Sequence, residues 1–429
     1  MKKLLCIILV ALLSLSLVGC VLNTPSGDGG GTQTPKTTKL VVLSAPDGSG
    51  DNMIISPYIP DFEKATGIDV DFTEIAMDNL HTQLTTIFAA KSAEVDVLWT
   101  WVGWTAEFGN AGHLEDLTDK LTKDEWDKYV PGALNCVTYK GRRYGLPKFF
   151  SIRGFYCNEL ALQKAGITKL PETWDEMVEY AKATTNKDKD EYGLLFGMGN
   201  NNNLLISFQD VLVLTGGQIV DSNDNIKFNE PEGVEALEKI VELVNLGVID
   251  PASYGIVFGT DKRERWNKGL NAMTWEWAAT YVMANDPAQS AFAGHCVVTR
   301  VPSIKTTGAI TGSEGHSISK YSQNKEAALD LIKFLSSNDV QKKMVLKTGW
   351  YPVVNSLFED QEVLASSPLF QYAAEQSKYP TMRFAAPYTT ELQDTLGPEL
   401  LLAVQGKKTA KQALDDAAAK VKDIISQYK

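Results

Sequence analysis

A strand-helix-strand-helix-strand order in residues 40–101 places the strongest constraint on how this chain can fold. The apolar runs at 40–44 and 95–101 are typical of buried strands, and residues 68–72 alternate between apolar and polar as a strand does. Amphipathic stretches that indicate helices lie between these segments. Because parallel strands need a crossover connection, usually a helix, this order predicts an α/β fold with a parallel sheet covered on both faces.

Several helix boundaries are marked by their end residues. Ser56-Pro57 opens a helix that Gly67 ends, and Thr173 and Glu176 have the spacing of a capping box. Further helices are expected from Pro231 to Gly247, over 324–337, and near the C-terminus. The residues expected to face inward are Ile59, Phe62 and Ala65; Leu80, Leu84, Ile87 and Phe88; Trp174, Met177, Val178 and Ala181; Val234, Leu237, Val241 and Val244; Ala328, Leu331, Ile332 and Leu335; Leu414, Ala417, Val421 and Ile424.

Length and charge narrow the class further. The chain has 429 residues, well beyond the ~150 residues that one domain typically needs, so at least two packed units are expected. No Pro/Gly-rich linker divides the sequence after residue 40, which predicts that the chain passes between these units more than once. A formal net charge of -12 repels phosphate backbones and argues against a nucleic-acid partner.

The first twenty residues are typical of an export signal. Lys2 and Lys3 precede an apolar run that ends at Val18, and small residues follow before Cys20. The apolar run is shorter than the ~20 residues needed to span a bilayer, which favours a cleaved leader over a permanent anchor helix. We expect residues 1–19 to be a signal peptide and the mature chain to lie outside the cytoplasm.

Residues 17–20, Leu-Val-Gly-Cys, resemble the lipobox of bacterial lipoproteins. In that motif the cysteine becomes the lipid-modified first residue of the mature chain. The resemblance therefore implies acyl chains on Cys20, and a protein anchored to the outer face of the cytoplasmic membrane or located in a periplasm. Residues 22–39 lack apolar periodicity, so 20–39 should be the lipidated N-terminus and a flexible tether.

Three cysteines remain after the leader and the lipidation site: Cys136, Cys157 and Cys296. At most one disulfide can form among them, and no CxxC or His-Cys spacing indicates a metal or redox site. We interpret all three as small buried hydrophobic residues.

No motif in the sequence requires a cofactor or a metal. There is no GxxxxGK[ST] phosphate loop, no HExxH and no GxSxG. Gly48-Ser-Gly50 begins like a dinucleotide fingerprint, but Met53 replaces the third glycine. Residues 221–232 have calcium-loop spacing with isoleucine in place of the essential glycine, and an ordinary hairpin turn explains them as well. The histidines are scattered, which is typical of structural or surface positions: His81, His113, His295 and His316.

Six of the nine tryptophans lie in three short segments, and this clustering is the informative feature. They are Trp99, Trp101 and Trp104; Trp275 and Trp277 on either side of Glu276; and Trp350 beside Tyr351. Open α/β sheets bind ligands outside the carboxyl ends of their strands, which is where the predicted strand at 95–101 places its indoles. Aromatic plates with a carboxylate between them suit a sugar, whose C–H face stacks on rings while its hydroxyls need polar partners.

Packing in the core is the other role that a tryptophan can take. It is favoured for indoles that lie alone on a helical stripe or inside a strand, namely Trp99, Trp126, Trp174 and Trp266. Ligand contact is favoured for those at or after the ends of elements, namely Trp101, Trp104, Trp277 and Trp350. Trp275 stays open between the two roles.

Segments spread over nearly the whole mature chain resemble, in order, the bacterial extracellular solute-binding family, the sugar-binding lipoproteins of ABC importers that include maltose-binding protein. Each segment is weak alone, and the shared order carries the resemblance. They are Phe62-Glu-Lys-Ala-Thr-Gly-Ile-Asp-Val; Asp96-Val-Leu-Trp-Thr-Trp-Val-Gly-Trp104; Tyr144-Gly-Leu-Pro147; Phe155-Tyr-Cys-Asn158; Lys164-Ala-Gly166; Trp266-Asn-Lys-Gly269; Ala272-Met273; Ile318-Ser-Lys320; and Asn324-Lys-Glu-Ala-Ala.

The resemblance implies a periplasmic-binding-protein-like fold, in which two α/β lobes are joined by hinge crossovers and hold the ligand in a cleft between them. It places one lobe at 40–150 plus 311–350 and the other at 151–310 plus 351–429. Carried over position by position, it implies ligand contacts at Asp47, Trp101, Trp104, Phe150, Ser151, Arg153, Glu276, Trp277, Trp350, Tyr351 and Tyr388.

Three positions depart from the family pattern. Gly103 stands where members often place an acidic residue, Ser151 where maltose-binding protein has a glutamate, and Ala279 where a stacking tryptophan is usual. Trp275 therefore joins the candidate contacts, because Trp275 or Trp277 could supply the missing ring. The departures leave the choice of sugar open.

Together these features predict a non-enzymatic, lipid-anchored receptor that captures a mono- or oligosaccharide and hands it to the permease of an ABC importer. It is expected to act as a monomer without a cofactor, closing its lobes around the ligand. The alternatives are a secreted carbohydrate-active hydrolase with a carboxylate pair, an adhesion lipoprotein, or a receptor of the same fold for a peptide or polyamine. The aromatic excess favours sugar.

Overall fold

The computed structural model describes residues 38–46, 55–257, 259–379, 381–382 and 384–428. The predicted signal peptide, the lipidation site at Cys20, nearly all of the tether and the candidate contact Asp47 lie outside these residues. From Thr38 onward the chain forms one compact unit. Among the described helices, none combines the length and the apolar character that a bilayer crossing needs.

The described strands form two main sheets and one small hairpin. The first sheet has the order β12-β11-β3-β1-β2 with β6 also paired to β11, the second has the order β10-β7-β9-β8, and β4 pairs with β5. The strands are β1 (Lys39–Ser44), β2 (Asp69–Glu74), β3 (Val97–Trp101), β4 (Thr138–Tyr139), β5 (Arg142–Arg143), β6 (Gly145–Ile152), β7 (Gly154–Asn158), β8 (Tyr192–Leu195), β9 (Asn271–Glu276), β10 (Cys296–Thr299), β11 (Ala309–Ile318) and β12 (Thr381–Met382).

Helices cover both sheets. The α-helices are α2 (Ile59–Thr66), α3 (Met77–Ala89), α4 (Val102–Asn110), α5 (Lys123–Trp126), α6 (Pro131–Leu134), α7 (Glu159–Lys164), α8 (Trp174–Thr184), α9 (Asn201–Thr215), α10 (Pro231–Leu246), α11 (Gly259–Asn267), α12 (Ala279–Ala284), α13 (Lys325–Leu335), α14 (Asn338–Thr348), α15 (Gln361–Ser366), α16 (Leu369–Gln376), α17 (Thr389–Val404) and α18 (Ala410–Ser426). Short 3-10 segments are η1 (Ser56–Tyr58), η2 (Asn135–Val137), η3 (Lys187–Lys189), η4 (Pro251–Gly255) and η5 (Asn355–Phe358).

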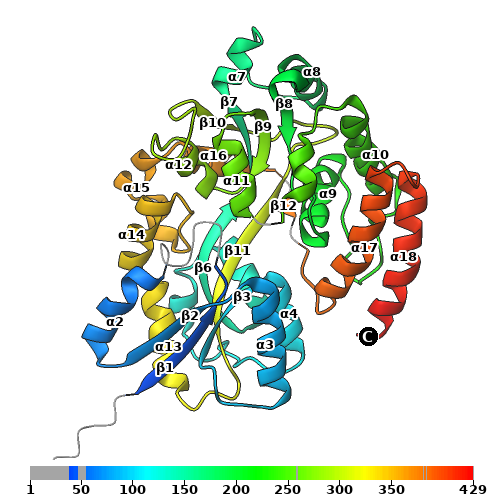
Figure 1. Cartoon of the computed structure of the whole chain (residues 1–429). Coiled ribbons are helices and arrows are strands. Elements are labelled where there is room, and N and C mark those ends of the chain that lie inside the picture. Colours follow the sequence, from blue (N-terminus) through cyan, green and yellow to red (C-terminus); the bar gives the residue numbers. More distant parts are fainter. Residues whose placement is uncertain (1–37, 47–54, 258, 380, 383, 429) are drawn as a thin grey trace, which may run out of the picture. The chain divides into compact units, whose positions relative to one another are not determined.

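The N-terminal part of the first sheet has the predicted parallel arrangement. β1 pairs in parallel with β2 on one side and with β3 on the other, and α2 and α13 lie on one side of the sheet while α3 and α4 lie on the other (Figure 1). Every residue of β3 is buried, as expected for an inner parallel strand. The buried carboxylate of Asp96 accepts hydrogen bonds from Val41 N and Ser322 Oγ, and so ties β1 to the segment before α13.

The predicted helix signals are confirmed with one exception. Thr173 and Glu176 form a capping box at the start of α8, and Gly67 and Gly247 end α2 and α10 in the left-handed conformation. The prediction that Ala65 faces inward is wrong, because Ala65 is exposed on the outer side of α2. The predicted burial of the cysteines is confirmed, and all three are free thiols: Cys136, Cys157 and Cys296.

Two chain passages between the sheets, β6 to β7 and β10 to β11, lie beside the segment at Tyr351. β6 of the first sheet leads through Arg153 directly into β7 of the second. Arg153 N donates to Ile310 O at the start of β11, and Phe150 and Tyr351 form an isolated antiparallel bridge with backbone hydrogen bonds of 3.1 Å in both directions. Figure 1 shows β6 and β11 running together from the first sheet toward the second.

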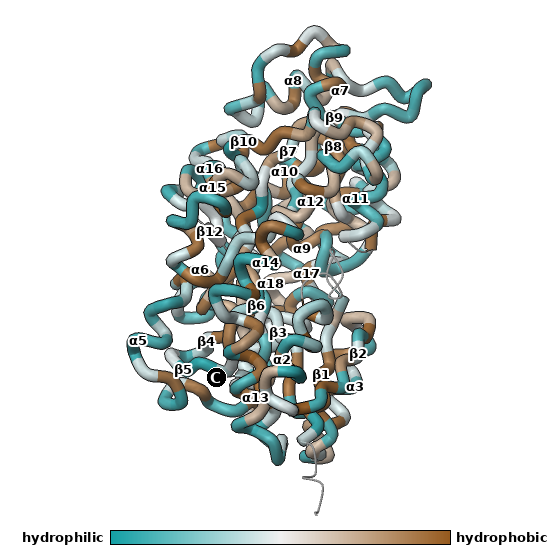
Figure 2. Tube along the Cα trace, turned by 90° about the vertical axis from the view of Figure 1, so that its left-hand side faces the viewer, coloured by the Kyte–Doolittle hydropathy of each residue, from teal (hydrophilic) through white to brown (hydrophobic). Residues whose placement is uncertain are grey.

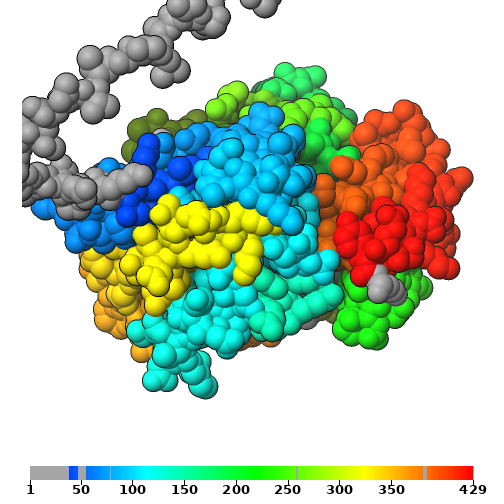
Figure 3. Space-filling view, turned by 90° about the horizontal axis from the view of Figure 1, so that it is seen from below, coloured from blue at the N-terminus to red at the C-terminus, as the bar shows by residue number. Residues whose placement is uncertain are grey.

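In the parts of the molecule around both sheets, segments that are far apart in the sequence pack against each other. Phe62 of α2 packs against Phe334 of α13 with ring centroids 5.6 Å apart, and in Figure 3 the yellow residues around α13 lie against the blue N-terminal segment. The helices α17 and α18 pack on each other and on α9 and α10. Hydrophilic residues lie mainly on the outer turns and loops (Figure 2).

Candidate functional site

A cavity of about 680 Å³ lies between residues of the first sheet and residues of the second. Ala45 after β1 and Trp101 at the end of β3 line it from one sheet, and Gly197 after β8 and Glu276 at the end of β9 line it from the other. Each pair belongs to parallel strands, so the cavity lies outside carboxyl strand ends, where α/β sheets bind ligands. Its volume falls within the ~300–1,000 Å³ of ordinary small-molecule sites.

Aromatic rings from both halves line this cavity. They are Trp99, Trp101, Trp104, Phe149, Trp277 and Trp350. Trp99 and Trp104 lie at nearly right angles with ring centroids 5.1 Å apart, and Phe149 stacks on Trp350 at 4.2 Å. Rings held by neighbouring rings lose little further freedom when a ligand stacks on them, so the wall is preorganised for a flat, partly apolar ligand face.

Two glycines make room for two of these indoles. A Cβ atom on Gly103 would lie 2.7 Å from the Trp101 ring, and a Cβ atom on Gly312 of β11 would lie 2.6 Å from the Trp277 ring. The first contact gives a physical reason for glycine at position 103, because an acidic side chain there would displace the indole. The second shows that Trp277, which follows β9 of the second sheet, packs on β11 of the first.

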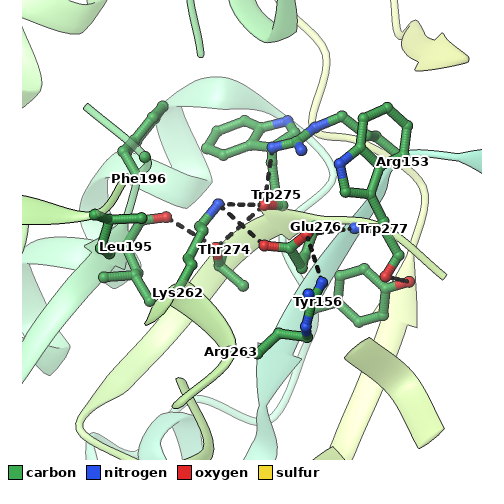
Figure 4. Close-up of polar contacts among 12 residues, drawn as sticks. Arg153, Tyr156, Leu195, Phe196, Lys262, Arg263, Thr274, Trp275, Glu276 and Trp277 are labelled. Carbon is green, nitrogen blue, oxygen red and sulfur yellow. Dashed lines mark hydrogen bonds and ion pairs between the residues drawn. The ribbon is translucent and has the colours of Figure 1, made fainter. Parts of the chain in front are cut away.

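A cluster of buried charges surrounds the end of β9 (Figure 4). Arg153 Nε and Nη2 donate to the two carboxylate oxygens of Asp210 at 2.8 and 2.9 Å, and the guanidinium lies 5.0 Å from the ring centre of Trp277. Lys262 Nζ donates to the carbonyl oxygen of Trp275 at 2.6 Å.

Glu276 is the carboxylate at the centre of this cluster. Its Oε1 accepts a hydrogen bond from Trp277 N at 2.9 Å, and its oxygens lie 3.6 Å from Lys262 Nζ and 3.9 Å from Arg263 Nη1. Burial alone would raise the pKa of Glu276, but Lys262, Arg153 and Arg263 together bring it below its ordinary value. Glu276 is therefore held as an anion by three cations.

Burial shifts the pKa of two other members of the cluster. It raises the pKa of the Asp210 carboxyl, against the opposing effect of Arg153. It lowers the pKa of Lys262 to about 8, although Glu276 favours the charged ammonium. Burial thus disfavours the charged forms of both Asp210 and Lys262. The contact with Arg153 stabilises the Asp210 carboxylate, and the contact with Glu276 stabilises the Lys262 ammonium.

The shifted pKa of Lys262 predicts a specific pH dependence of stability. Because its pKa is about 8 in the folded protein and 10.5 in an ordinary environment, the unfolded chain binds more protons between these two values. The contribution of Lys262 to the free energy of unfolding therefore rises as pH increases through this window. We expect the stability of the wild type relative to Lys262→Met, measured by urea denaturation, to increase from about pH 7.5 to about pH 9.5. A difference that stays constant over this range would contradict the expectation.

The opposite wall carries a second carboxylate, Glu314, whose charge is balanced by a nearby lysine. Glu314 of β11 accepts a hydrogen bond from Trp99 Nε1 at 2.6 Å and lies 3.6 Å from Lys148 Nζ. His81 of α3 also lines the cavity, with its Nε2 2.8 Å from Glu107 Oε1. At the start of α9, Asn200, Asn202 and Asn203 add amide groups. Hydroxyl-rich ligands would find both donors and acceptors here.

The predicted site residues divide into two groups. Six of them line the cavity: Trp101, Trp104, Arg153, Glu276, Trp277 and Trp350. The other five with described positions are not among the lining residues: Phe150, Ser151, Trp275, Tyr351 and Tyr388. The indole of Trp275 packs against Phe155 and Trp174, Tyr351 OH donates to Leu369 O, and Tyr388 OH donates to Asp224.

Sequence reasoning missed several lining residues, among them Phe149, Lys262, Arg263 and Glu314. For the two cations a signal was available. They precede Trp266 by four and three residues, so in a helix they share its face, and a face that buries an indole will bury them too. Phe149 and Glu314 are placed by pairing between β6 and β11, which no local pattern predicts.

The comparisons with known proteins agree with this geometry. Residues 47–342 match the family described as bacterial extracellular solute-binding protein. A probable ABC transporter-binding protein of Deinococcus radiodurans is 27% identical over 66% of this chain and 67% of its own. The galactooligosaccharide-binding protein of Bacillus subtilis is 25% identical over 99% of this chain and 97% of its own. The maltose-bound structure of MalE3 from T. maritima superposes with a TM-score of 0.82 at 26% identity, covering 90% of this chain and 100% of that one.

Two α/β lobes with a cavity at their strand ends define a binding protein of the periplasmic type. The chain belongs to the bacterial extracellular solute-binding protein family and is the solute-binding component of an ABC transporter. Members of this family bind their solutes without chemical conversion and work outside the cytoplasm together with transporter permeases.

Proposed function

We propose that this protein captures a mono- or oligosaccharide in the cavity between its lobes and delivers it to a membrane permease. The observation that carries the proposal is the aromatic wall, in which Trp101 and Trp104 come from one lobe and Trp277 from the other. Rings on both sides can stack on the C–H faces of a sugar while the charged and amide groups bind its hydroxyls. Relatives that bind maltose and galactooligosaccharide support the same ligand class.

The charges of the cavity argue against a cationic solute. The cluster at the end of β9 holds three cations, Arg153, Lys262 and Arg263, against two carboxylates, Asp210 and Glu276. A polyamine would add positive charge beside an excess of buried positive charge, which is costly in an environment of low dielectric constant. A saccharide carries no such penalty.

Closure by hinge bending is part of the proposal. We assign one lobe to 40–150 plus 311–350 and the other to 151–310 plus 351–429. Support comes from Phe150, Arg153, Ile310 and Tyr351, which lie at the proposed boundaries and are joined by backbone hydrogen bonds. Adjacent crossovers form a narrow hinge, and a ligand that touches both lobes stabilises the closed form over the open one.

Titration across a saccharide panel tests the ligand class. Stoichiometric binding of at least one mono- or oligosaccharide, with a ligand-induced rise in melting temperature, is expected from a receptor. Incubation with the same sugar in labelled form then separates a receptor from a hydrolase, because a hydrolase would release shorter products. A panel without any binding, or with turnover, would overturn the proposal.

We further propose that Cys20 is lipidated and anchors the protein to the outer face of the membrane. In a bacterial expression host the wild type should partition into the detergent-rich phase, because two or more acyl chains bind a bilayer stably. Cys20→Ala should move to the aqueous phase with an unchanged melting temperature and unchanged sugar affinity. If the variant partitions like the wild type, Cys20 is not the anchor.

A further inference from the structure

Arg263 is a residue of the cavity wall that carries two buried, unsatisfied donors. Its side chain is 2% exposed, it lines the cavity, and its Nε and Nη2 have no hydrogen-bond partner among the described residues. Within the described ranges, Nη1 alone approaches an anion, at 3.9 Å from Glu276 Oε1, which is an ion pair without a hydrogen bond. Buried N–H groups are almost always paired in folded proteins, so an acceptor from outside the chain is expected here.

The two free donors lie on the same edge of the guanidinium. Nε–H and the adjacent Nη2–H point in parallel, and this edge matches the two oxygens of a carboxylate. In the same cluster, Arg153 uses this edge to bind Asp210 through Nε and Nη2. The equivalent edge of Arg263 has no such carboxylate within the described part of the chain.

The charge balance points to the same kind of acceptor. Among the residues that the structure describes in this cluster, three cations stand against two carboxylates, so one positive charge has no partner there. If Asp210 were counted as neutral, the excess of positive charge would be larger. A buried charge without a counter-charge is unfavourable. Gly259 and Thr260, the first two residues of α11, also line the cavity, and the N–H groups of a first helical turn favour an anion.

We propose that the saccharide bound by this protein carries a carboxylate, as a uronic acid does, and that Arg263 binds this group through Nε and Nη2. The inference rests on the proposed function and narrows it to acidic sugars. The aromatic wall then stacks on the sugar ring, and Glu276 holds the guanidinium in place from its other side.

Matched ligands test this without any mutation. The probes are D-galacturonic and D-glucuronic acid and their disaccharides, each compared at neutral pH with the uncharged uronamide and with the parent neutral sugar. In isothermal titration the acid should bind at least ~10-fold tighter than its amide and its parent, because charge-assisted bidentate hydrogen bonds are lost in both. A neutral parent that binds as tightly as its acid would overturn the inference and leave the proposed function intact. No binding of any saccharide would overturn both.

Variants then assign the preference to Arg263. Arg263→Gln should bring the affinity ratio of acid to amide to about one, and Arg263→Lys, which keeps the charge but loses the fork, should give an intermediate ratio. Arg142→Gln is the control, because Arg142 is 60% exposed and pairs with Asp116 at the surface. It should keep the wild-type ratio. Melting curves of the free variants verify that each is folded, and an unchanged ratio in folded Arg263→Gln would refute the assignment.

Discussion

Replacing Arg153 with methionine is expected to lower the free energy of unfolding by about 3–5 kcal/mol. The Asp210 side chain is 1% exposed, and Arg153 donates both of the hydrogen bonds that its carboxylate accepts from described side chains. The substitution leaves a buried carboxylate without its counter-ion, and it also removes the donor to the Trp275 carbonyl oxygen. Urea denaturation at neutral pH measures the loss.

A double variant separates this explanation from a simple packing defect. Arg153→Met with Asp210→Leu removes both charges, so much of the lost stability should return, because a well-packed apolar pair can replace a buried ion pair. The single variant should also recover stability as pH falls, since protonation of Asp210 removes its charge. A loss below about 1 kcal/mol in the single variant would contradict the assigned role of the ion pair.

Replacing Trp277 with alanine is expected to weaken saccharide binding by about 2–3 kcal/mol, or roughly 30–150-fold. The indole is half-buried, lines the cavity, and contacts the Arg153 guanidinium and Gly312 of β11 in the first sheet. Because the ring is partly exposed, stability should fall by only about 1 kcal/mol. Isothermal titration with the sugar identified in the panel measures the affinity.

Trp126 provides a matched control for this prediction. It also lies under a guanidinium, with Arg143 4.4 Å from its ring centre, but it is not among the lining residues that the structure describes. Trp126→Phe should leave the affinity unchanged, whereas Trp277→Phe should weaken it to a lesser extent than alanine does. Equal affinities of the wild type and Trp277→Ala would remove Trp277 from the site.

Local signals in the sequence predicted the three parallel strands β1, β2 and β3 of the first sheet and several of the helices, but not β6, β11 or β12. The period of apolar residues over 40–101 was sufficient for β1 to β3, and the capping box at Thr173 and the glycine at 247 marked the ends of α8 and α10. Such features depend on neighbours within about one or two turns, so they can be read without tertiary structure. The prediction that Ala65 faces inward was wrong because helical spacing defines the buried face only approximately. Alanine also has a small side chain that contributes little to which face is buried.

The site was predictable only in part, because strand geometry and long-range pairing decide it. Side chains alternate along β9, so the indole of Trp275 packs inside its lobe while Glu276 lines the cavity, and Trp277 reaches the cavity only because the strand has ended. Proximity in sequence therefore did not distinguish Trp275, which is not among the described lining residues, from Glu276 and Trp277, which are. Tyr388 is placed by the packing of α17 and its hydrogen bond to Asp224, 164 positions away, and nothing near it in the sequence carries that information.

The position of β11 has a consequence for the order in which this protein can fold. β11 pairs with β3 and with β6, and Ser317 contacts Thr100 across 217 positions of sequence. During synthesis β3 therefore keeps an open edge until roughly 210 more residues have been added, and β6 until roughly 160 more have been added. Such distant pairings form slowly. A polypeptide that completes its first sheet so late stays unfolded for longer. An unfolded chain is the form that can pass through a membrane, so late completion suits a protein that works outside the cytoplasm.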